Sequence, residues 1–298
     1  MIKNNYFIFL KIVLIYINII IYFLFIKMSK VNIPQIKLYN GHTIPQFGIG
    51  VFQIKDNKEC EQVCLEAFKR GYRHIDTAHI YGNEKGVGAA VKKSGIPREE
   101  FYITTKLWIG DFGEGKSLKE VDEMLKRLDT DYIDLLLLHW PKGDYIGAYK
   151  DMEKAYNQGK VRSIGLSNFT EKQIEEIMSM CTVKPAIDQI ELHPYGQRRE
   201  VVDLCNKYNI KVEAWYPLAH GEKELLENPI FTRIGKKYNK TNAQVILRWH
   251  IQKGYIIFPR SRNPVHIAEN INIFDFNLTK DEMDEIDSLD RQKLYLFW

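Results

Sequence analysis

The feature that most constrains this chain is a repeated alternation of short apolar runs with amphipathic stretches over residues 36–290. Each apolar run has the length of a strand, and each following stretch of about 10–15 residues has the spacing of a helix. The alternation occurs eight times. Strand-then-helix repeats of this kind predict a parallel sheet with helices packed against it.

Eight units favour a closed (β/α)8 barrel, an α/β fold, over an open doubly wound sheet. Leu135–Leu138 is a continuous apolar run, as expected for a strand covered on both faces. No Pro-, Gly- or Ser-rich linker interrupts residues 36–290, so we expect one barrel domain over residues 28–298. The eight strands are expected to end near Gly50, Asp76, Lys106, His139, Ser167, Glu191, Trp215 and Pro259.

Two additions to the barrel are expected at the ends of this domain. Residues 36–45 place Asn40-Gly41 between apolar alternations, which predicts an N-terminal β-hairpin. Residues 277–289 have the pattern of an extra C-terminal helix, and an apolar, aromatic tail then runs to Trp298.

Residues 1–27 form a separate hydrophobic segment. Residues 6–26 are broken only by Lys11 and Asn18, and as a helix they would be about 31 Å long, enough to cross a bilayer. Two interpretations stay open: a membrane anchor, or translation that starts at Met28 and leaves a cytoplasmic protein. They differ in location and not in chemistry.

Charge and cysteine content exclude several functions. The formal charge of +4 arises from 42 basic and 38 acidic residues, and three of the basic ones lie in the first segment, so the body is close to neutral. Nucleic acid is therefore not an expected partner. Four cysteines in so long a chain indicate a reducing compartment without a disulfide framework. None of the eight histidines has metal-ligand spacing, so no metal is expected.

Polar side chains fall at or just beyond the ends of successive predicted strands. The candidates are Asp76, Tyr81, Lys106 and His139. Because the active site of a β/α barrel lies at the carboxyl ends of its strands, these four side chains are expected to meet in one pocket.

Together the four side chains suit proton transfer to a carbonyl oxygen. An ammonium beside a phenol favours the phenolate, so Lys106 is expected to lower the pKa of Tyr81 from its reference of about 10. A carboxylate at Asp76 would keep Lys106 charged and in place. His139 can donate a hydrogen bond to a carbonyl oxygen and orient it. Gly86-Val87-Gly88 lies within a helical pattern and so indicates helix packing, not a dinucleotide fingerprint.

With these motifs in place, the sequence resembles the aldo-keto reductase family. The resemblance covers about residues 36–290 in family order. Its main motifs are Gly71-Tyr72-Arg73-His74-Ile75-Asp76-Thr77-Ala78, Tyr81-Gly82-Asn83-Glu84, Thr104-Thr105-Lys106-Leu107-Trp108, Leu137-Leu138-His139-Trp140-Pro141, Gly165-Leu166-Ser167-Asn168-Phe169, Gln189-Ile190-Glu191-Leu192-His193-Pro194 and Pro259-Arg260-Ser261.

The resemblance implies a (β/α)8 barrel that binds NADPH and reduces aldehydes or ketones to alcohols. It assigns proton donation to Tyr81, its tuning to Lys106 and Asp76, and carbonyl orientation to His139. The implied cofactor contacts are Ser167, Asn168 and Gln189 at the nicotinamide carboxamide, Trp215 stacked on the ring, residues 217–222 with Pro217 and Leu218 over the pyrophosphate, Arg260, Ser261 and Arg262 at the extra phosphate, and Glu269 and Asn270 at the adenine.

Two positions depart from the family pattern. His266 stands where many relatives have an arginine that helps to hold the adenosine phosphate, and an unperturbed histidine is largely neutral at pH 7. Trp215 also replaces the tyrosine common in the family, although either ring supplies a flat face.

Substrate and assembly are less constrained by the sequence. Phe52, Trp108, Trp140 and Trp298 are expected to line an aromatic pocket for a small carbonyl substrate. Short connections after Trp108 and Pro141 predict an open pocket, and family habit suggests a monomer or weak dimer. The competing hypothesis is a non-catalytic, NADPH-binding regulatory subunit of a membrane channel, which an N-terminal membrane segment would suit.

Overall fold

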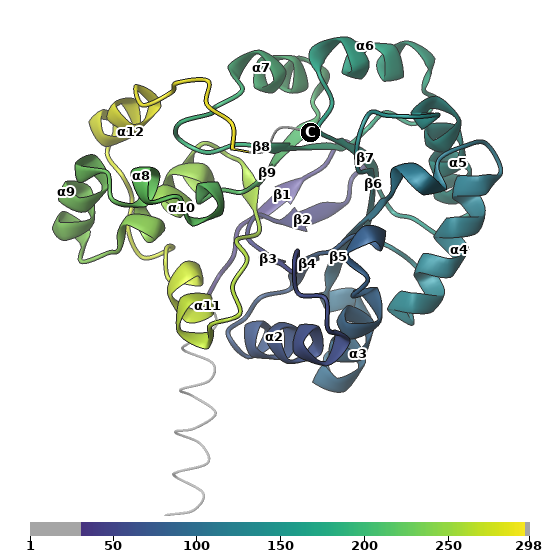
Figure 1. Ribbon diagram of the computed structural model, residues 1–298, viewed down its shortest axis with the longest axis horizontal. Coiled ribbons are helices and arrows are strands. Elements are labelled where there is room, and N and C mark those ends of the chain that lie inside the picture. Colours follow the sequence, from purple (N-terminus) through teal and green to yellow (C-terminus); the bar gives the residue numbers. More distant parts are fainter. Residues whose placement is uncertain (1–30, 296–298) are drawn as a thin grey trace, which may run out of the picture. The chain divides into compact units, whose positions relative to one another are not determined.

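Eight parallel strands form the centre of the molecule in the computed structural model, which describes residues 31–295 (Figure 1). Neighbouring strands in the chain are neighbours in the sheet, from β3 through to β10. The Gly48 amide donates to the Ile257 carbonyl at 2.8 Å, and the Ile257 amide donates to Gln46 at 3.0 Å. These bonds join the first strand to the last and close the barrel. The strands are β3 (Ile49–Gly50), β4 (His74–Asp76), β5 (Tyr102–Leu107), β6 (Leu135–Leu138), β7 (Ile164–Ser167), β8 (Ile187–Glu191), β9 (Lys211–Trp215) and β10 (Ile256–Ile257).

Helices surround the barrel, as Figure 1 shows in the view along it. They bury their apolar faces against the strands, and β6, with four leucines, is buried throughout. The predicted closed barrel is therefore confirmed. The helices are α2 (Asn57–Lys69), α3 (Glu84–Ser94), α4 (Lys116–Leu128), α5 (Tyr145–Asn157), α6 (Glu171–Met180), α7 (Arg199–Tyr208), α8 (Lys223–Leu226), α9 (Pro229–Tyr238), α10 (Asn242–Gln252), α11 (Pro264–Ile271) and α12 (Lys280–Asp287).

Capping side chains define where several helices begin. The Asp56 carboxylate accepts from the Glu59 amide at 2.8 Å at the start of α2. Thr170 and Gln173 form a reciprocal capping box at the start of α6. These side chains accept hydrogen bonds from backbone amides that the first helical turn leaves without partners. They therefore determine where the loop after the preceding strand ends and the helix begins.

Close packing holds α3 between its neighbours. A Cβ atom on Gly86 would lie 2.5 Å from the Asn57 carbonyl oxygen of α2, and one on Gly88 would lie 2.3 Å from the Leu128 carbonyl oxygen of α4. The two glycines therefore permit contact between helix backbones, as the helical pattern around them predicted. Since α3 directly follows the loop that carries Tyr81, its position also determines where that loop lies.

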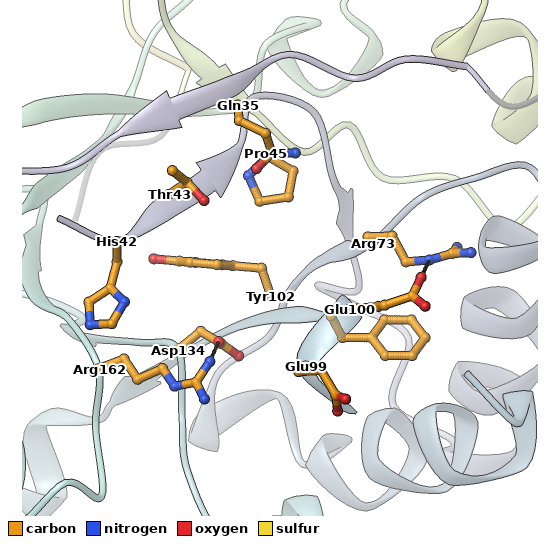
Figure 2. A pocket seen from close by; sticks show the side chains of 11 residues that line it. Gln35, His42, Thr43, Pro45, Arg73, Glu99, Glu100, Tyr102, Asp134 and Arg162 are labelled. Atoms are coloured by element: carbon orange, nitrogen blue, oxygen red, sulfur yellow. Dashed lines mark ion pairs between the residues drawn. The ribbon is translucent and has the colours of Figure 1, made fainter. Parts of the chain in front are cut away.

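An antiparallel hairpin, β1 (Gln35–Lys37) with β2 (Thr43–Pro45), precedes the barrel as predicted. Its connection is a five-residue loop, residues 38–42, and not a two-residue Asn-Gly turn; only Gly41 of that pair has a positive φ, of 90°. A cavity of about 270 Å³ lies between the hairpin and the amino ends of the strands (Figure 2). Its Arg162 and Arg73 side chains lie 3.6 and 3.8 Å from carboxylates of Asp134 and Glu100, so this cavity is lined by ion pairs.

The predicted extra helix is α12, and the chain beyond it returns to the barrel. The Lys293 amide donates to the Tyr195 carbonyl at 2.9 Å, and the Tyr295 amide donates at 2.6 Å to Glu191, the last residue of β8. Residues 1–27 and Trp298 lie outside the described residues. Within residues 31–295, no helix combines the length and apolar character needed to cross a bilayer.

Candidate active site

A cavity of about 690 Å³ opens at the carboxyl ends of the barrel strands. Residues at the end of nearly every strand line it, including Gly50, Asp76, Ser167, Gln189 and Trp215. This is the end of a β/α barrel at which active sites are built. Of the four side chains predicted to meet in one pocket, Asp76, Tyr81 and His139 line this cavity. Lys106 is fully buried and does not line it.

A buried ion pair lies beneath the floor of this cavity. Lys106 Nζ donates to both carboxylate oxygens of Asp76 at 2.8 Å and to the Thr77 carbonyl at 2.9 Å. Both side chains are almost wholly buried, so three acceptors replace the water that the ammonium lost. Burial raises the pKa of Asp76, while the charge of Lys106 and its hydrogen bonds act in the opposite direction.

Tyr81 lies above this pair, at the end of the short 3-10 helix η1 (His79–Tyr81) that follows β4. Its ring centre is 5.1 Å from Lys106 Nζ, 5.0 Å from the Phe52 ring and 5.7 Å from the His139 ring. Its hydroxyl has no hydrogen-bond partner within residues 31–295, and the residue lines the cavity. The phenol is thus held between the ion pair and the space available to a substrate.

The pKa of Tyr81 moves in the direction opposite to the one that the sequence suggested. Burial of the phenol raises the pKa well above 10, and the negative charge of Asp76 adds to the rise. The sequence predicted the pairing of Lys106 with Asp76, but it did not show how deeply the phenol of Tyr81 is buried, and burial is the largest cause of the rise. Tyr81 therefore keeps its proton at neutral pH, as a proton donor must.

His139 stands at the end of β6 between two aromatic side chains. Its ring lies 5.7 Å from that of Tyr81 and 5.3 Å from that of Trp108, edge to face in both cases. Burial and the nearby Lys106 charge hold the pKa of His139 well below 6.5. The imidazole is neutral at pH 7 and carries one N–H donor, which is the form suited to bonding a carbonyl oxygen.

Polar groups along the next strands form a connected set. Trp215 Nε1 donates to Asn168 Oδ1 at 2.9 Å, and Asn168 Nδ2 donates to the His139 carbonyl at 3.1 Å. Ser167 Oγ donates to the Gln189 carbonyl at 2.9 Å. Asn168 adopts a φ of 65°, a conformation that asparagine tolerates better than most residues. These contacts fix a flat indole face and several amide groups at one end of the cavity.

A carboxylate that sequence reasoning missed lies behind this set. Glu213, in the interior of β9, is fully buried and its Oε2 accepts from Gln189 Nε2 at 2.8 Å. Burial and the Asp76 charge raise its pKa from 4.5 to about 8. The signal was available, because a charged residue inside a strand covered on both faces needs a partner.

The other end of the cavity carries the residues that the resemblance assigned to the adenosine part of the cofactor. They are Pro217, Leu218, Arg260, Ser261, His266, Glu269 and Asn270, and all line the cavity. Arg262 does not. Its guanidinium instead lies 3.0 Å from Glu59 of α2 and donates to the Gln53 carbonyl. Arg260 is thus the guanidinium that the cavity presents to an anion.

Aromatic side chains form the wall near Tyr81, as predicted. Phe52, Trp108 and Trp140 all line the cavity, whereas the predicted contribution of Trp298 falls outside the described residues. Ile80 and Tyr216 line it as well and were not predicted, and so does His220, which belongs to the predicted segment 217–222. The Tyr216 and His220 rings stack at 4.8 Å and 25°, so the loop after β9 is held by a ring pair.

One group of potential metal ligands occurs beside the site. His79 Nδ1 lies 2.6 Å from Asp111 Oδ2 and 3.5 Å from Glu120 Oε1. Asp111 Oδ2 also accepts from the Trp108 amide at 3.1 Å, and Glu120 also pairs with Arg127. These atoms already have partners, and the cluster joins the loop of Tyr81 to the loop of Trp108. The absence of a metal stays a prediction.

A closed parallel barrel with a polar, aromatic-walled cavity at the carboxyl ends of its strands defines a barrel enzyme. The groups in that cavity fit a phosphorylated nicotinamide cofactor: a flat indole at Trp215, amide groups at Asn168 and Gln189, and a guanidinium at Arg260. A tyrosine also lies over the buried lysine in this cavity, with its ring centre 5.1 Å from Lys106 Nζ.

Comparison with known proteins identifies the family. The model of the Aldo/keto reductase family matches residues 46–291, and the chain belongs to that family. It is 43% identical over 264 residues to a 9,11-endoperoxide prostaglandin H2 reductase of Trypanosoma cruzi, covering 88% of this chain and 93% of the relative. It is 44% identical over 259 residues to a glyoxal reductase of Bacillus subtilis, covering 87% and 93%.

Solved structures agree with this assignment. An aldo-keto reductase of Bombyx mori in complex with NADP superposes with a TM-score of 0.84 at 33% identity, covering 88% of this chain and 94% of that one. The chain is an oxidoreductase that reduces aldehydes and ketones to alcohols with NADPH. No contact within residues 31–295 favours the non-catalytic regulatory alternative.

Proposed function

We propose that this chain reduces small aldehydes and dicarbonyl compounds, with Tyr81 as the proton donor. The observation that carries the proposal is the placement of the Tyr81 ring 5.1 Å from Lys106 Nζ, at the floor of an aromatic-walled cavity. Asp76, Tyr81, Lys106 and His139 converge there from three consecutive strands and the loop that follows the first.

Proton donation follows from the charges around Tyr81. Its raised pKa keeps the phenol protonated until an alkoxide forms next to it. The phenolate that results is then stabilised by the ammonium of Lys106, which Asp76 holds in position at 2.8 Å. Because this ion pair is buried, the attraction between ammonium and phenolate is stronger than it would be in water.

The remaining groups orient the reactants. Neutral His139 donates a hydrogen bond to the carbonyl oxygen and directs it toward the Tyr81 hydroxyl. Ser167, Asn168 and Gln189 would hold the nicotinamide carboxamide, Trp215 would stack on the ring, and Arg260 would bind the extra phosphate. Bound NADPH supplies the hydride.

The wall of the cavity supports a small, carbonyl-bearing substrate. Phe52, Trp108 and Trp140 supply apolar surface near Tyr81, which favours an uncharged substrate part. The glyoxal reductase of Bacillus subtilis, 44% identical, points to dicarbonyls within this class. We therefore expect glyoxal and methylglyoxal to be turned over faster than long-chain ketones.

The test is NADPH consumption with a panel of aldehydes and dicarbonyls, comparing the wild type with Tyr81→Phe. The variant should bind NADPH normally and lose about 10²–10⁴-fold in turnover, as expected for a lost general acid. A variant with full turnover would show that the proton comes from another group.

We also propose a cytoplasmic monomer or weak dimer. Three of the four free cysteines are buried and unbridged, as is usual in a reducing compartment. Fractionation of cells that express the chain from Met1 or from Met28 tests the location, and light scattering over a concentration series tests the assembly. A stable tetramer, or recovery of the Met28 form in membranes, would contradict these proposals.

A further inference from the structure

The side-chain amide of Gln189 is held between two buried carboxyl groups. Gln189 Nε2 lies 2.8 Å from Asp76 Oδ2 on one side and 2.8 Å from Glu213 Oε2 on the other. Gln189 itself is 2% exposed and Glu213 is fully buried, so water does not compete for these bonds. The two acceptors come from β4 and β9, on opposite sides of β8 in the sheet order.

This arrangement determines which end of the amide faces the cavity. An amide nitrogen has two N–H donors, and the two carboxyl groups take both of them. The reversed orientation would place Oε1 2.8 Å from an oxygen of the Asp76 carboxylate, which is a repulsive contact in a buried site, and it would lose the bond to Glu213 unless that carboxyl carried a proton on Oε2. Gln189 Oε1 is left as an acceptor with no partner within residues 31–295, and the residue lines the cavity.

We propose that Glu213 is a positioning residue that fixes the Gln189 amide, so that the site selects a ligand with an N–H donor opposite Gln189 Oε1. This inference rests on the proposed contact between Gln189 and the nicotinamide carboxamide, whose NH2 group is such a donor. A nicotinamide analogue with an acetyl group in place of the carboxamide has no N–H there, and should bind less well.

Asp76 alone does not give this orientation. Both of its oxygens already accept from Lys106 at 2.8 Å, so Gln189 shares the Oδ2 atom with an ammonium. Glu213 has no competing donor at Oε2. Its other oxygen, Oε1, lies 3.4 Å from His74 Nε2. Burial raises the pKa of Glu213, and a neutral carboxyl with its proton on Oε1 leaves Oε2 free to accept.

The experiment compares the full chain with Glu213→Met and Glu213→Gln. Methionine fills a similar volume but accepts no strong hydrogen bond, while glutamine keeps a carbonyl oxygen for Gln189. Equilibrium dissociation constants are measured for three probes: NADP+, its 3-acetylpyridine analogue, and 2′,5′-ADP, which has no nicotinamide. Binding is followed by protein fluorescence, and unfolding curves check that each variant is folded.

We expect the wild type to prefer NADP+ over the acetylpyridine analogue by about tenfold, the value of one net hydrogen bond of about 1.4 kcal/mol. Glu213→Met should reduce this preference to about twofold, and Glu213→Gln should retain it. Affinity for 2′,5′-ADP should be the same in all three proteins. If Glu213→Met does not fold, Glu213→Ser, which is too short to reach Gln189, gives the same comparison.

Two outcomes would overturn the proposal in different ways. If the wild type and Glu213→Met prefer NADP+ to the same extent, Glu213 does not position Gln189, although the contact between Gln189 and the carboxamide would stand. If the wild type binds NADP+ and the acetylpyridine analogue equally well, the proposed contact between Gln189 and the nicotinamide carboxamide is wrong as well. Tyr81-dependent turnover would then still show whether the proposed proton donor is correct.

Discussion

Glu213→Gln should make the stability of this protein less dependent on pH. Burial and the neighbouring Asp76 charge raise the pKa of Glu213 from 4.5 to about 8 in the folded chain. Between these two values the folded protein holds a proton at Glu213 that the unfolded chain has released. Raising the pH through this window therefore favours unfolding, and the glutamine variant lacks this contribution.

The size of the effect follows from proton linkage. One proton released on unfolding lowers the free energy of unfolding by about 1.4 kcal/mol for each pH unit. From pH 5.5 to 7.5 the wild type should lose about 2–3 kcal/mol relative to Glu213→Gln. The contribution of Glu213 to the free energy of unfolding is fully present below its pKa in the unfolded chain, 4.5, and is lost as the pH rises through its pKa in the folded chain, about 8.

Urea unfolding at pH 5.5, 6.5 and 7.5 measures this difference, since urea leaves charge interactions unscreened. Other titrating groups, such as the buried Asp188, are common to both proteins and cancel in the comparison. Glu227→Gln, at an exposed glutamate, is the matched control, and its difference from the wild type should not vary with pH. A constant difference for Glu213→Gln as well would show that Glu213 is ionised throughout this range.

Three further predictions concern the ion pair, the helix packing and the phosphate contact. Lys106→Met leaves the Asp76 carboxylate without its buried counter-charge, so urea unfolding at pH 7 should show a free energy of unfolding lower by about 3–5 kcal/mol. Adding Asp76→Asn should recover part of this loss. A single variant as stable as the wild type would mean that the pair is not buried as described. Gly88→Ala places a methyl group 2.3 Å from the Leu128 carbonyl oxygen and should lower the free energy of unfolding by about 1–3 kcal/mol. Ala89→Ser, at an exposed position of the same helix, is the control and should change it little. Equal effects of the two substitutions would argue against close packing of α3 on α4. Arg260→Ala should weaken NADPH binding by about 10–100-fold more than NADH binding in fluorescence titrations, and equal losses would exclude a contact with the extra phosphate.

The positions of the strands and of the main reactive groups were predictable from the sequence. Apolar runs such as Leu135–Leu138 must be buried, and the polar residue that follows each run must then lie at one end of the barrel. That reasoning placed Asp76, Lys106 and His139 correctly in the structure.

Properties that depend on distance through space were not predictable. The direction of the Tyr81 pKa shift depends mainly on how deeply the phenol is buried, and that depth is not visible along the chain. The cluster of His79, Asp111 and Glu120 joins residues from the segment after β4, the segment after β5 and helix α4. Arg262 carries the charge expected of a phosphate ligand, yet Glu59 of α2 pairs with it outside the cavity.

The bonds that join residues 46 and 48 to residue 257 have a consequence for biosynthesis. The first strand finds its second neighbour only when the last strand has left the ribosome, so the ring cannot close on a partial chain. Arg260, His266 and Asn270, which line the cavity and which the family resemblance assigns to the cofactor, follow that strand, so a nascent chain lacks these residues of the cavity. Contacts so distant in sequence slow folding and leave edge strands exposed meanwhile. This enzyme should therefore gain its cofactor after synthesis, and its nascent form should depend on chaperones more than its final stability suggests.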